Sequence, residues 1–196
     1  MCCINTLKLN IQDILSPIPL THPFHIMLFK YLGFNQNSFR EASLSGIFIA
    51  ESAGMPMQSV EHAEAVSGKG ILGDRYLNKT GYWDPVEGCQ VTLISEHDLK
   101  QAKSGNDLIF DNGQHRRNLV IKGIKTKALE GKQFKIGEVV FSYEKPRPPC
   151  GYLNKIQGNG MALALSYNSG ICIRVIQGGR LSIGDAVSVI DSDNDS

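Results

Sequence analysis

The chain has 196 residues, with 20 Lys and Arg against 19 Asp and Glu, so its net charge is only +1. Near-neutrality argues against a general nucleic-acid binder and against a polybasic membrane-surface protein, because both need a basic excess. The length predicts one domain with an appended segment, large enough to bury a core without disulfides. Apolar runs are too short for a transmembrane helix, and prolines near the start argue against a signal peptide.

Residues 1–43 differ from the rest of the chain, with few charges, three prolines and apolar patches at 7–15 and 24–29. We interpret this segment as an arm outside the main domain. An exposed apolar arm would be a patch that monomers avoid, so we expect it to pack on the domain or on a second subunit in a homodimer. The main domain is expected at 44–190, and the acidic residues 191–196 are expected to fray.

From Leu44 onward, short apolar runs alternate with glycine-containing turns. The segment Ser95-Glu96-His97-Asp98 is a capping pattern, which predicts a helix ending near Lys103. Runs rich in β-branched and aromatic residues predict strands between these turns. The predicted strands lie at 45–50, 60–66, 89–94, 118–122 and 170–176.

Two later segments, Phe134–Val140 and Leu181–Val187, share the pattern apolar-x-Ile-Gly-acid-x-Val. Each indicates strand entry through a glycine turn, and two hairpins of this shape are typical of a small barrel. Many short strands and few helices predict a mainly β fold. We expect a closed antiparallel β-barrel with a few short helices in its connections, because closure removes free sheet edges.

The five cysteines are scattered and form no CxxC pair. An odd, scattered set fits reduced thiols in a cytoplasmic protein better than a disulfide framework. Neither these cysteines nor the five histidines have zinc-site spacing. The cysteines are Cys2, Cys3, Cys89, Cys150 and Cys172.

Cys150 follows a stiff segment, Lys145-Pro146-Arg147-Pro148-Pro149, and precedes residues 151–156, which can begin a short helix. Proline fixes φ at about −65°, so the segment holds the thiol in a defined direction. A helix N-terminus and the nearby Arg147 both favour thiolate over thiol. Cys150 is therefore the candidate catalytic residue; the alternative is a buried thiol that ends a loop.

A second candidate site is Gly70–Tyr76, preceded by Lys69. Glycines such as Gly73 let a backbone approach a ligand, and Lys69 and Arg75 could hold an anion. The alternative is an ordinary turn in which Asp74 and Arg75 merely pair with each other.

A third candidate is His115-Arg116-Arg117-Asn118, which leads into a buried strand. Adjacent residues of an extended chain point to opposite faces, so one arginine is expected to face a cavity and the other water. The amide of Asn118 could read the edge of a heterocycle. Arg174, within an apolar strand, is the fourth candidate. For these arginines, a solvated loop and an outward solvent face are the alternatives.

Common catalytic motifs are missing from the sequence. There is no dinucleotide-binding fingerprint, phosphate-binding loop, nucleophile elbow or H-E-x-x-H metal motif. Five lysines between 122 and 135 indicate a solvated face rather than a nucleic-acid groove. We therefore expect a small-molecule substrate, with no nucleic acid and no membrane as partners.

Taken in order, these strings resemble the MOSC domain, named for the C-terminal domain of molybdenum-cofactor sulfurases. The resemblance spans roughly 44–190 and rests on the ordered set rather than on any one string. The strings are Gly70–Tyr76, Gln90–Ile94, Arg116–Val120, Leu129–Glu138, Pro149-Cys150, Arg174–Gly179 and Gly184-Asp185.

The resemblance implies a β-barrel like the barrel domain of pyruvate kinase. It also implies a central cysteine, here Cys150, that either ligates molybdenum or carries sulfur as a persulfide. The arginine-asparagine string would hold the pterin or phosphate of the molybdenum cofactor, and whether Arg116 or Arg117 takes that role stays open. The cofactor-binding candidates are Arg116, Arg117, Asn118, Lys69, Gly73, Asp74, Arg75 and Arg174.

The chain looks most like small, stand-alone bacterial members of the family. It has no aminotransferase-like domain, so we expect no bound pyridoxal phosphate. The first hypothesis is a molybdenum-dependent oxidoreductase that reduces N-hydroxylated substrates and takes electrons from an external donor. The second is a sulfur carrier, with Cys150 receiving sulfur from a pyridoxal-phosphate-dependent cysteine desulfurase. The third is a non-catalytic cofactor-binding module.

Overall fold

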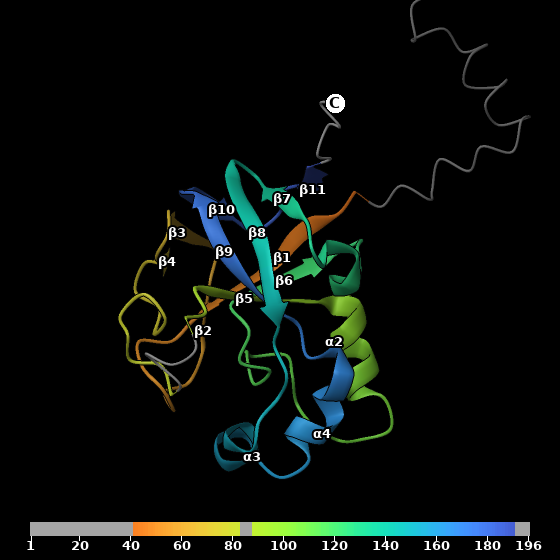
Figure 1. The fold of residues 1–196 in the computed structure, drawn as a ribbon. Helices are drawn as coiled ribbons and strands as arrows, with labels where there is room; N and C mark the ends of the chain where they lie inside the picture. Colours follow the sequence, from red (N-terminus) through yellow and green to blue (C-terminus); the bar gives the residue numbers. More distant parts are fainter. Residues whose placement is uncertain (1–40, 83–87, 191–196) are drawn as a thin grey trace, which may run out of the picture. The chain divides into compact units, whose positions relative to one another are not determined.

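The computed structural model describes residues 41–82 and 88–190. Most of the predicted arm and the predicted frayed tail therefore lie outside the described residues. Within them, an eight-stranded sheet and a three-stranded sheet carry short helices in their connections (Figure 1). This confirms the prediction of a mainly β fold with few helices.

The larger sheet is mixed, since β5 and β6 are parallel while its other neighbours are antiparallel. In spatial order its strands are β11 (Val187–Ile190), β7 (Gln133–Ile136), β8 (Val139–Pro146), β9 (Ile171–Gln177), β5 (Val91–Ser95), β6 (Leu119–Lys122), β1 (Ser43–Ile49) and β2 (Gln58–Val60). The smaller sheet is β10 (Gly179–Ser182), β3 (His62–Val66) and β4 (Gly70–Ile71).

The prediction of a closed antiparallel barrel is wrong: the large sheet is open, with β11 and β2 at its edges. Among the described residues, β1 meets the segment before β11 at one isolated bridge, Ser43 with Ala186, and at the hydrogen bonds around it. One of these runs from Leu44 N to Asp185 O over 2.8 Å. The chain is turning at this point, because Asp185 N–H also donates to Ser182 O, so no ladder extends along β1.

The two repeated strings adopt different structures. The first forms a hairpin, in which β7 and β8 pair at Ile136 and Val139 around Gly137, whose φ is 58°. In the second, β10 and β11 flank the turn at Gly184 but pair with β3 and β7, in different sheets. The repeat therefore predicted the turn, and it did not predict the pairing.

Two apolar clusters lie on either side of β5. Val91 and Leu93 belong to the main core of the large sheet, in which Phe134 and Phe141 stack with ring centroids 5.8 Å apart. Ile94 points to the other side, into a smaller cluster formed with residues of the helices. Because successive side chains of a strand alternate in facing, a strand between two cores is buried throughout, as β5 is.

The helix predicted from the capping pattern is confirmed as α2 (Glu96–Lys103), with Ser95 Oγ accepting from Asp98 N over 3.1 Å. The helix expected after Cys150 is α3 (Gly151–Gln157), which lies with α4 (Met161–Leu165) at one end of the domain, beyond the end of β8 (Figure 1). Two short 3-10 helices are η2 (Thr126–Leu129) and η3 (Ser166–Asn168). None of the helices among the described residues has the length and apolar character needed to cross a membrane.

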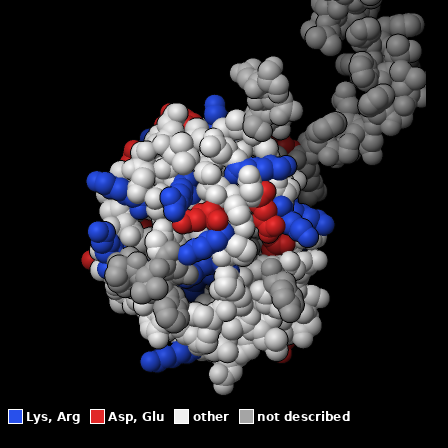
Figure 2. All heavy atoms as spheres, in the orientation of Figure 1, with Lys and Arg blue, Asp and Glu red and all other residues white. Residues whose placement is uncertain are grey.

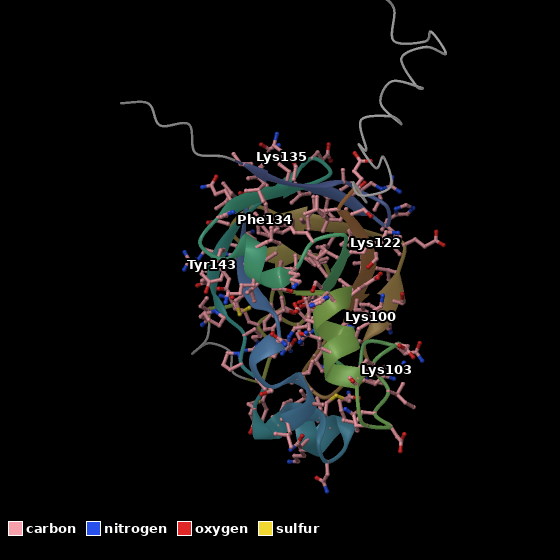
Figure 3. All side chains as sticks on the ribbon, turned by 90° about the vertical axis from the view of Figure 1, so that its right-hand side faces the viewer. Lys100, Lys103, Lys122, Phe134, Lys135 and Tyr143 are labelled. Carbon is pink, nitrogen blue, oxygen red and sulfur yellow. The ribbon has the colours of Figure 1, made fainter. Side chains whose placement is uncertain are left out.

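Charges of both signs are interspersed on the face shown in Figure 2, in keeping with the small net charge. The five lysines between 122 and 135 are exposed, and Lys122 and Lys135 extend outward from their strands (Figure 3). They form a solvated face, as predicted.

Gly170, just before β9, allows a test of how closely the strands approach. Its φ is 94°, and a Cβ atom there would overlap the carbonyl oxygen of Leu93. We expect Gly170→Ala to lower the free energy of unfolding by about 3 kcal/mol or more, measured by urea denaturation. Gly105 is the matched control, because its φ of 79° is similar but nothing lies within 4 Å of an added Cβ. Gly105→Ala should lower the free energy of unfolding by only about 1 kcal/mol. Equal losses in the two variants would contradict the close approach of Gly170 to the Leu93 carbonyl.

Candidate functional site

A pocket at the end of the domain near α3 contains about 540 Å³ of empty space, part of it open to solvent. Most of its lining comes from the loop after β4, the loop before β6, the proline-rich segment between β8 and α3, and α3 itself, with Ala53 added from the loop between β1 and β2. Basic side chains gather at a hollow near the middle of the face in Figure 2. Four arginines and one thiol line the pocket: Arg75, Arg116, Arg117, Arg147 and Cys150.

The lining of the pocket is strongly basic. Among the described residues no carboxylate lines it, and the nearest ion pair is the buried contact from Arg75 to Asp74 over 3.0 Å. Burial, with repulsion from Arg75, lowers the pKa of Arg116 to about 10, and burial likewise lowers the pKa of Arg117. Both shifts mean that the charged guanidinium is disfavoured there, so a bound anion would be stabilised.

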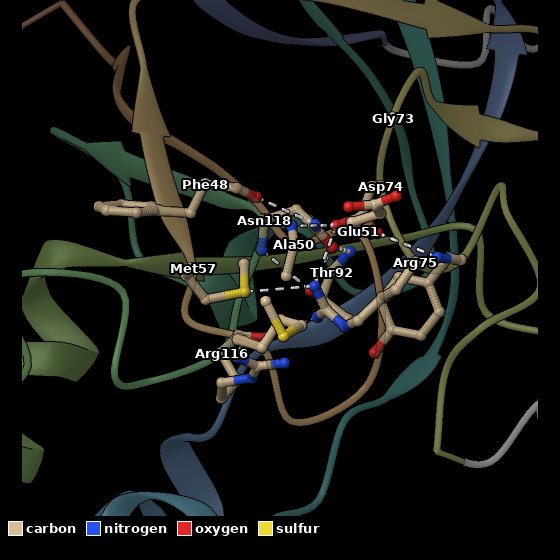
Figure 4. Close-up of polar contacts among 12 residues, drawn as sticks. Phe48, Ala50, Glu51, Met57, Gly73, Asp74, Arg75, Thr92, Arg116 and Asn118 are labelled. Carbon is tan, nitrogen blue, oxygen red and sulfur yellow. Dashed lines mark hydrogen bonds and ion pairs between the residues drawn. The ribbon is translucent and has the colours of Figure 1, made fainter.

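The loop after β4 is organised around the buried carboxylate of Asp74. That carboxylate accepts from Ala50 N and from Tyr76 N, each over 3.1 Å, as well as from Arg75. Arg75 in turn donates to Arg116 O over 3.1 Å (Figure 4). Asp74 and Arg75 thus pair as in an ordinary turn, and the same pairing holds Arg75 at the pocket wall.

Both arginines before β6 line the pocket, so the prediction that they point to opposite faces is wrong. The prediction assumed an extended chain, whereas Arg116 has φ 61°, a left-handed conformation that is rare outside glycine. Strain of this kind persists only when surrounding contacts enforce it, and it concentrates at functional sites.

The two arginines use their guanidinium groups differently. Arg117 donates to three backbone carbonyls, those of Ser169, His115 and Arg147, and so ties three loops together. Arg116 donates to Met55 O, which is its side chain's one hydrogen bond within the described part of the chain. Arg116 therefore keeps more donor capacity for a ligand than Arg117 does.

Asn118 lies behind the pocket and does not line it. Its Oδ1 accepts from Thr92 N and Thr92 Oγ1, at 3.1 and 2.7 Å, and its Nδ2 donates to Phe48 O over 3.1 Å. The side chain is fully buried and its hydrogen-bonding capacity is used within the protein (Figure 4). Asn118, immediately before β6, therefore links that strand to β5 and β1 through hydrogen bonds.

Three further candidates also lie away from the pocket lining. Lys69 is exposed in the turn between β3 and β4, and Gly73 is exposed in its own turn with φ 80°. Arg174 is exposed on β9 and pairs with Glu144 over 2.9 Å, a contact that raises the pKa of Arg174. Of the eight cofactor-binding candidates, the structure brings Arg75, Arg116 and Arg117 together with Cys150.

Several pocket residues were missing from the predicted site. Arg147 was expected only to influence Cys150, yet it lines the pocket and its guanidinium donates to the Tyr76 hydroxyl over 3.2 Å. Tyr82 and Tyr152 also line it, with rings stacked 3.7 Å apart. Tyr76 ends the predicted segment Gly70–Tyr76 but had been given no role, and for Tyr152 the only available signal was its position two residues after Cys150.

Cys150 is the N-cap residue of α3, as its position after the prolines predicted, and its side chain is half-buried. Among the described residues, no three His, Cys, Asp or Glu side chains come together as a metal site. A metal ion held by Cys150 would therefore need further ligands from a cofactor.

Comparisons with known proteins agree with this architecture. The model of the MOSC domain family matches residues 83–188. The YuaD protein from Bacillus subtilis has a similar structure, with a TM-score of 0.63 and 18% identity over 76% of this chain and 95% of that one. YiiM from Geobacillus stearothermophilus gives a TM-score of 0.58 at 18% identity, over 79% and 77%. No match was found among curated proteins.

His115 supports the arginine loop from within, and this makes a prediction about pH. Its Nδ1 accepts from Arg117 N over 3.0 Å, and burial together with Arg117 and Arg116 lowers its pKa to about 3. Between pH 6.5 and 3 the unfolded chain therefore binds the proton more tightly than the folded protein, so acidification destabilises the fold. At pH 4 this contribution should reach about 3 kcal/mol relative to neutral pH.

The measurement is urea unfolding from pH 7 to pH 4 for the wild type and for His115→Asn. Asn keeps an acceptor for Arg117 N–H but does not titrate. The variant should lose about 3 kcal/mol less than the wild type over this range. If the free energy of unfolding falls equally with pH in the wild type and the variant, His115 is not held neutral in the folded protein.

Proposed function

The chain belongs to the MOSC domain family, a family associated with molybdenum-cofactor binding, and we propose that it binds this cofactor in the arginine pocket. The observation that carries the proposal is a pocket lined by four guanidinium groups and one half-buried thiol, whose described lining residues include no carboxylate. Such a site favours an anion, and the thiol adds a soft ligand.

The residues present fit the chemistry of this cofactor in two respects. Its phosphate requires cationic donors, and guanidinium groups bind phosphate with directed, charge-assisted hydrogen bonds. Its metal already carries sulfur ligands from the pterin, so one protein thiol can complete the set. The described residues offer Cys150 and no multi-ligand metal cluster, which suits a metal that arrives with its own ligands.

Within the pocket we assign different tasks to the two adjacent arginines. Arg116 binds the anionic part of the cofactor, because its guanidinium retains donors. Arg117 holds the loops around the pocket in place, because its guanidinium already donates hydrogen bonds to backbone carbonyls of these loops. Pro148, Pro149 and Leu153 line the same pocket and give its Cys150 side an apolar surface.

The proposed reaction is the reduction of N-hydroxylated small molecules, with Cys150 as the protein's ligand to molybdenum. When bound, the cofactor supplies two-electron redox chemistry at its metal, and the protein holds and shields it. Electrons would come from an external donor.

Metal retention tests the proposal. The protein is purified from a host that makes the cofactor, and molybdenum per chain is measured by mass spectrometry. Arg116→Gln should bind the cofactor roughly ten- to a hundredfold more weakly, as expected for the loss of one charge-assisted contact. Arg174→Gln is the matched control, because Arg174 is exposed outside the pocket, and it should retain molybdenum like the wild type.

The variant Cys150→Ser distinguishes between the possible roles of the thiol. Loss of molybdenum in this variant, with an unchanged melting temperature, supports the ligand role. If Cys150→Ser instead retains as much molybdenum as the wild type, and neither protein shows reductase activity, a non-catalytic binding module is favoured. A wild type with no molybdenum above background would contradict cofactor binding altogether.

A sulfur-carrier function has its own structural support. Of the three cysteines described, only Cys150 is partly exposed, and it lines the pocket, while Cys89 and Cys172 are buried. A thiolate there could take sulfane sulfur from the persulfide of a cysteine desulfurase.

Incubation with a pyridoxal-phosphate-dependent desulfurase and sulfur-labelled cysteine tests this second function. Label should appear on Cys150 and be absent from Cys150→Ser. Labelling of a known acceptor in the same mixture, with none on Cys150, would exclude the carrier role.

A further inference from the structure

Two buried cysteines that the proposed function does not use lie in contact with each other. Cys89 lies two residues before the start of β5, and Cys172 lies in the neighbouring strand β9, opposite Thr92. Both are free thiols, and the Cys89 sulfur donates to the Cys172 sulfur over 2.6 Å. They are 6% and 0% exposed. Two thiols in direct contact need little rearrangement to become covalently linked.

The surroundings give the two sulfur atoms opposite tendencies. The hydrogen bond from Cys89 and the charges of Arg147, Lys145 and Arg117 lower the pKa of Cys172, against the effect of burial. The hydrogen bond to Cys172 and burial raise the pKa of Cys89 well above its usual value. Cys172 is therefore the easier of the two thiols to deprotonate, and we assign its sulfur as the nucleophile. A thiolate beside a thiol is the arrangement that favours disulfide formation.

We propose that Cys89 and Cys172 form an oxidation site at which a hydroperoxide converts the two thiols into a disulfide. In the first step the Cys172 thiolate attacks one oxygen of the peroxide, the O–O bond breaks, and the sulfur becomes a sulfenic acid while hydroxide leaves. In the second step the Cys89 sulfur attacks this sulfenic sulfur, and the S–O bond breaks. The proton of Cys89 leaves with the oxygen as water. Two electrons pass from sulfur to the peroxide.

The choice of oxidant follows from burial. Because Cys172 is fully buried, an oxidant reaches its sulfur only when the structure opens locally, and hydrogen peroxide needs a much smaller opening than a bulky disulfide does. Of the pair, Cys89 has the small exposed area through which the oxidant would arrive. The proposal does not depend on cofactor binding, and it is compatible with a protein whose cysteines are normally reduced.

The disulfide would close a long loop and join two neighbouring strands. The two residues are 83 positions apart in the chain, so the crosslink would restrict the unfolded state strongly. It would also tie β9 to β5 beside Thr92, which binds Asn118 next to the arginine loop. We expect the melting temperature of the oxidised full-length protein to rise by roughly 5–15 °C.

The test treats reduced, full-length protein with hydrogen peroxide, removes the peroxide with catalase, and unfolds the protein in an alkylating agent. Remaining disulfides are then reduced and labelled with a second agent of different mass, and all five cysteines are mapped by peptide mass spectrometry. Cys89 and Cys172 should carry the second label together, and an unreduced digest should contain their linked peptides. Dithiothreitol should restore two thiols and the lower melting temperature.

Cys172→Ala and Cys89→Ala provide the matched controls, and neither should gain the stabilisation. If either variant fails to fold, the mapping of the wild type still decides the question. Recovery of both cysteines with the first label after peroxide would overturn the proposal. So would linkage of either one to Cys150, or oxidation of Cys172 to sulfinic acid without linkage.

Discussion

The buried side chain of Asn118 holds the three strands that position the arginine pocket. Its carbonyl oxygen accepts from Thr92 in β5, its amide group donates to Phe48 in β1, and its own backbone leads into β6. The backbone adds two bonds, from Phe48 N to Asn118 O over 2.7 Å and from Asn118 N to Thr92 O over 3.0 Å. Because the alternative is a set of buried, unpaired polar groups, this network allows one arrangement of the strands. The left-handed Arg116, two residues before it, is held by that constraint.

The same arrangement explains how four arginines can share one pocket. Each guanidinium near the others raises the electrostatic energy of the folded state, and burial adds a desolvation cost. Arg117 is stabilised by three carbonyl oxygens, and Arg75 by Asp74. His115 contributes by remaining neutral, since a charged imidazole would add a further positive charge between them. These contacts offset part of the cost, and an anion in the pocket would offset more of it. Binding of an anion in the pocket would therefore stabilise the folded protein.

The sequence predicted features whose causes are local. Ser95 caps α2 through a bond to a residue three positions away, Gly137 turns a hairpin, and the prolines before Cys150 direct it to the start of α3. Features that depend on distant partners were predicted poorly. The parallel pairing of β5 with β6 and the short contact between Ser43 and Ala186 are set by how separate segments meet. Pattern alone could not distinguish them from a closed antiparallel barrel.

The candidate site shows the same division. Arg116 and Arg117 were identified as cations before a buried strand, but their shared direction depends on the backbone conformation of Arg116. Asn118 and Arg174 have residue types suited to ligand binding, and only the three-dimensional structure shows that Asn118 bonds to two strands and Arg174 to Glu144. The stacking of Tyr82 on Tyr152 joins residues 70 positions apart and left no periodic signal. Residue type alone was therefore not enough to assign a function to these side chains; the hydrogen-bond or ion-pair partner of each one had to be known.

The pocket and the buried thiol pair share two of their cations. Arg117 and Arg147 line the pocket, and their charges also lower the pKa of Cys172. An anion bound beside these arginines would weaken the field that favours the Cys172 thiolate, and the thiolate would in turn reduce the attraction of the pocket for anions. Linkage requires these two effects to be equal in free energy. If the thiol pair is oxidised as we propose, this opposition would be lost, and the oxidation state of the pair would be coupled to the occupancy of the pocket through Arg117 and Arg147.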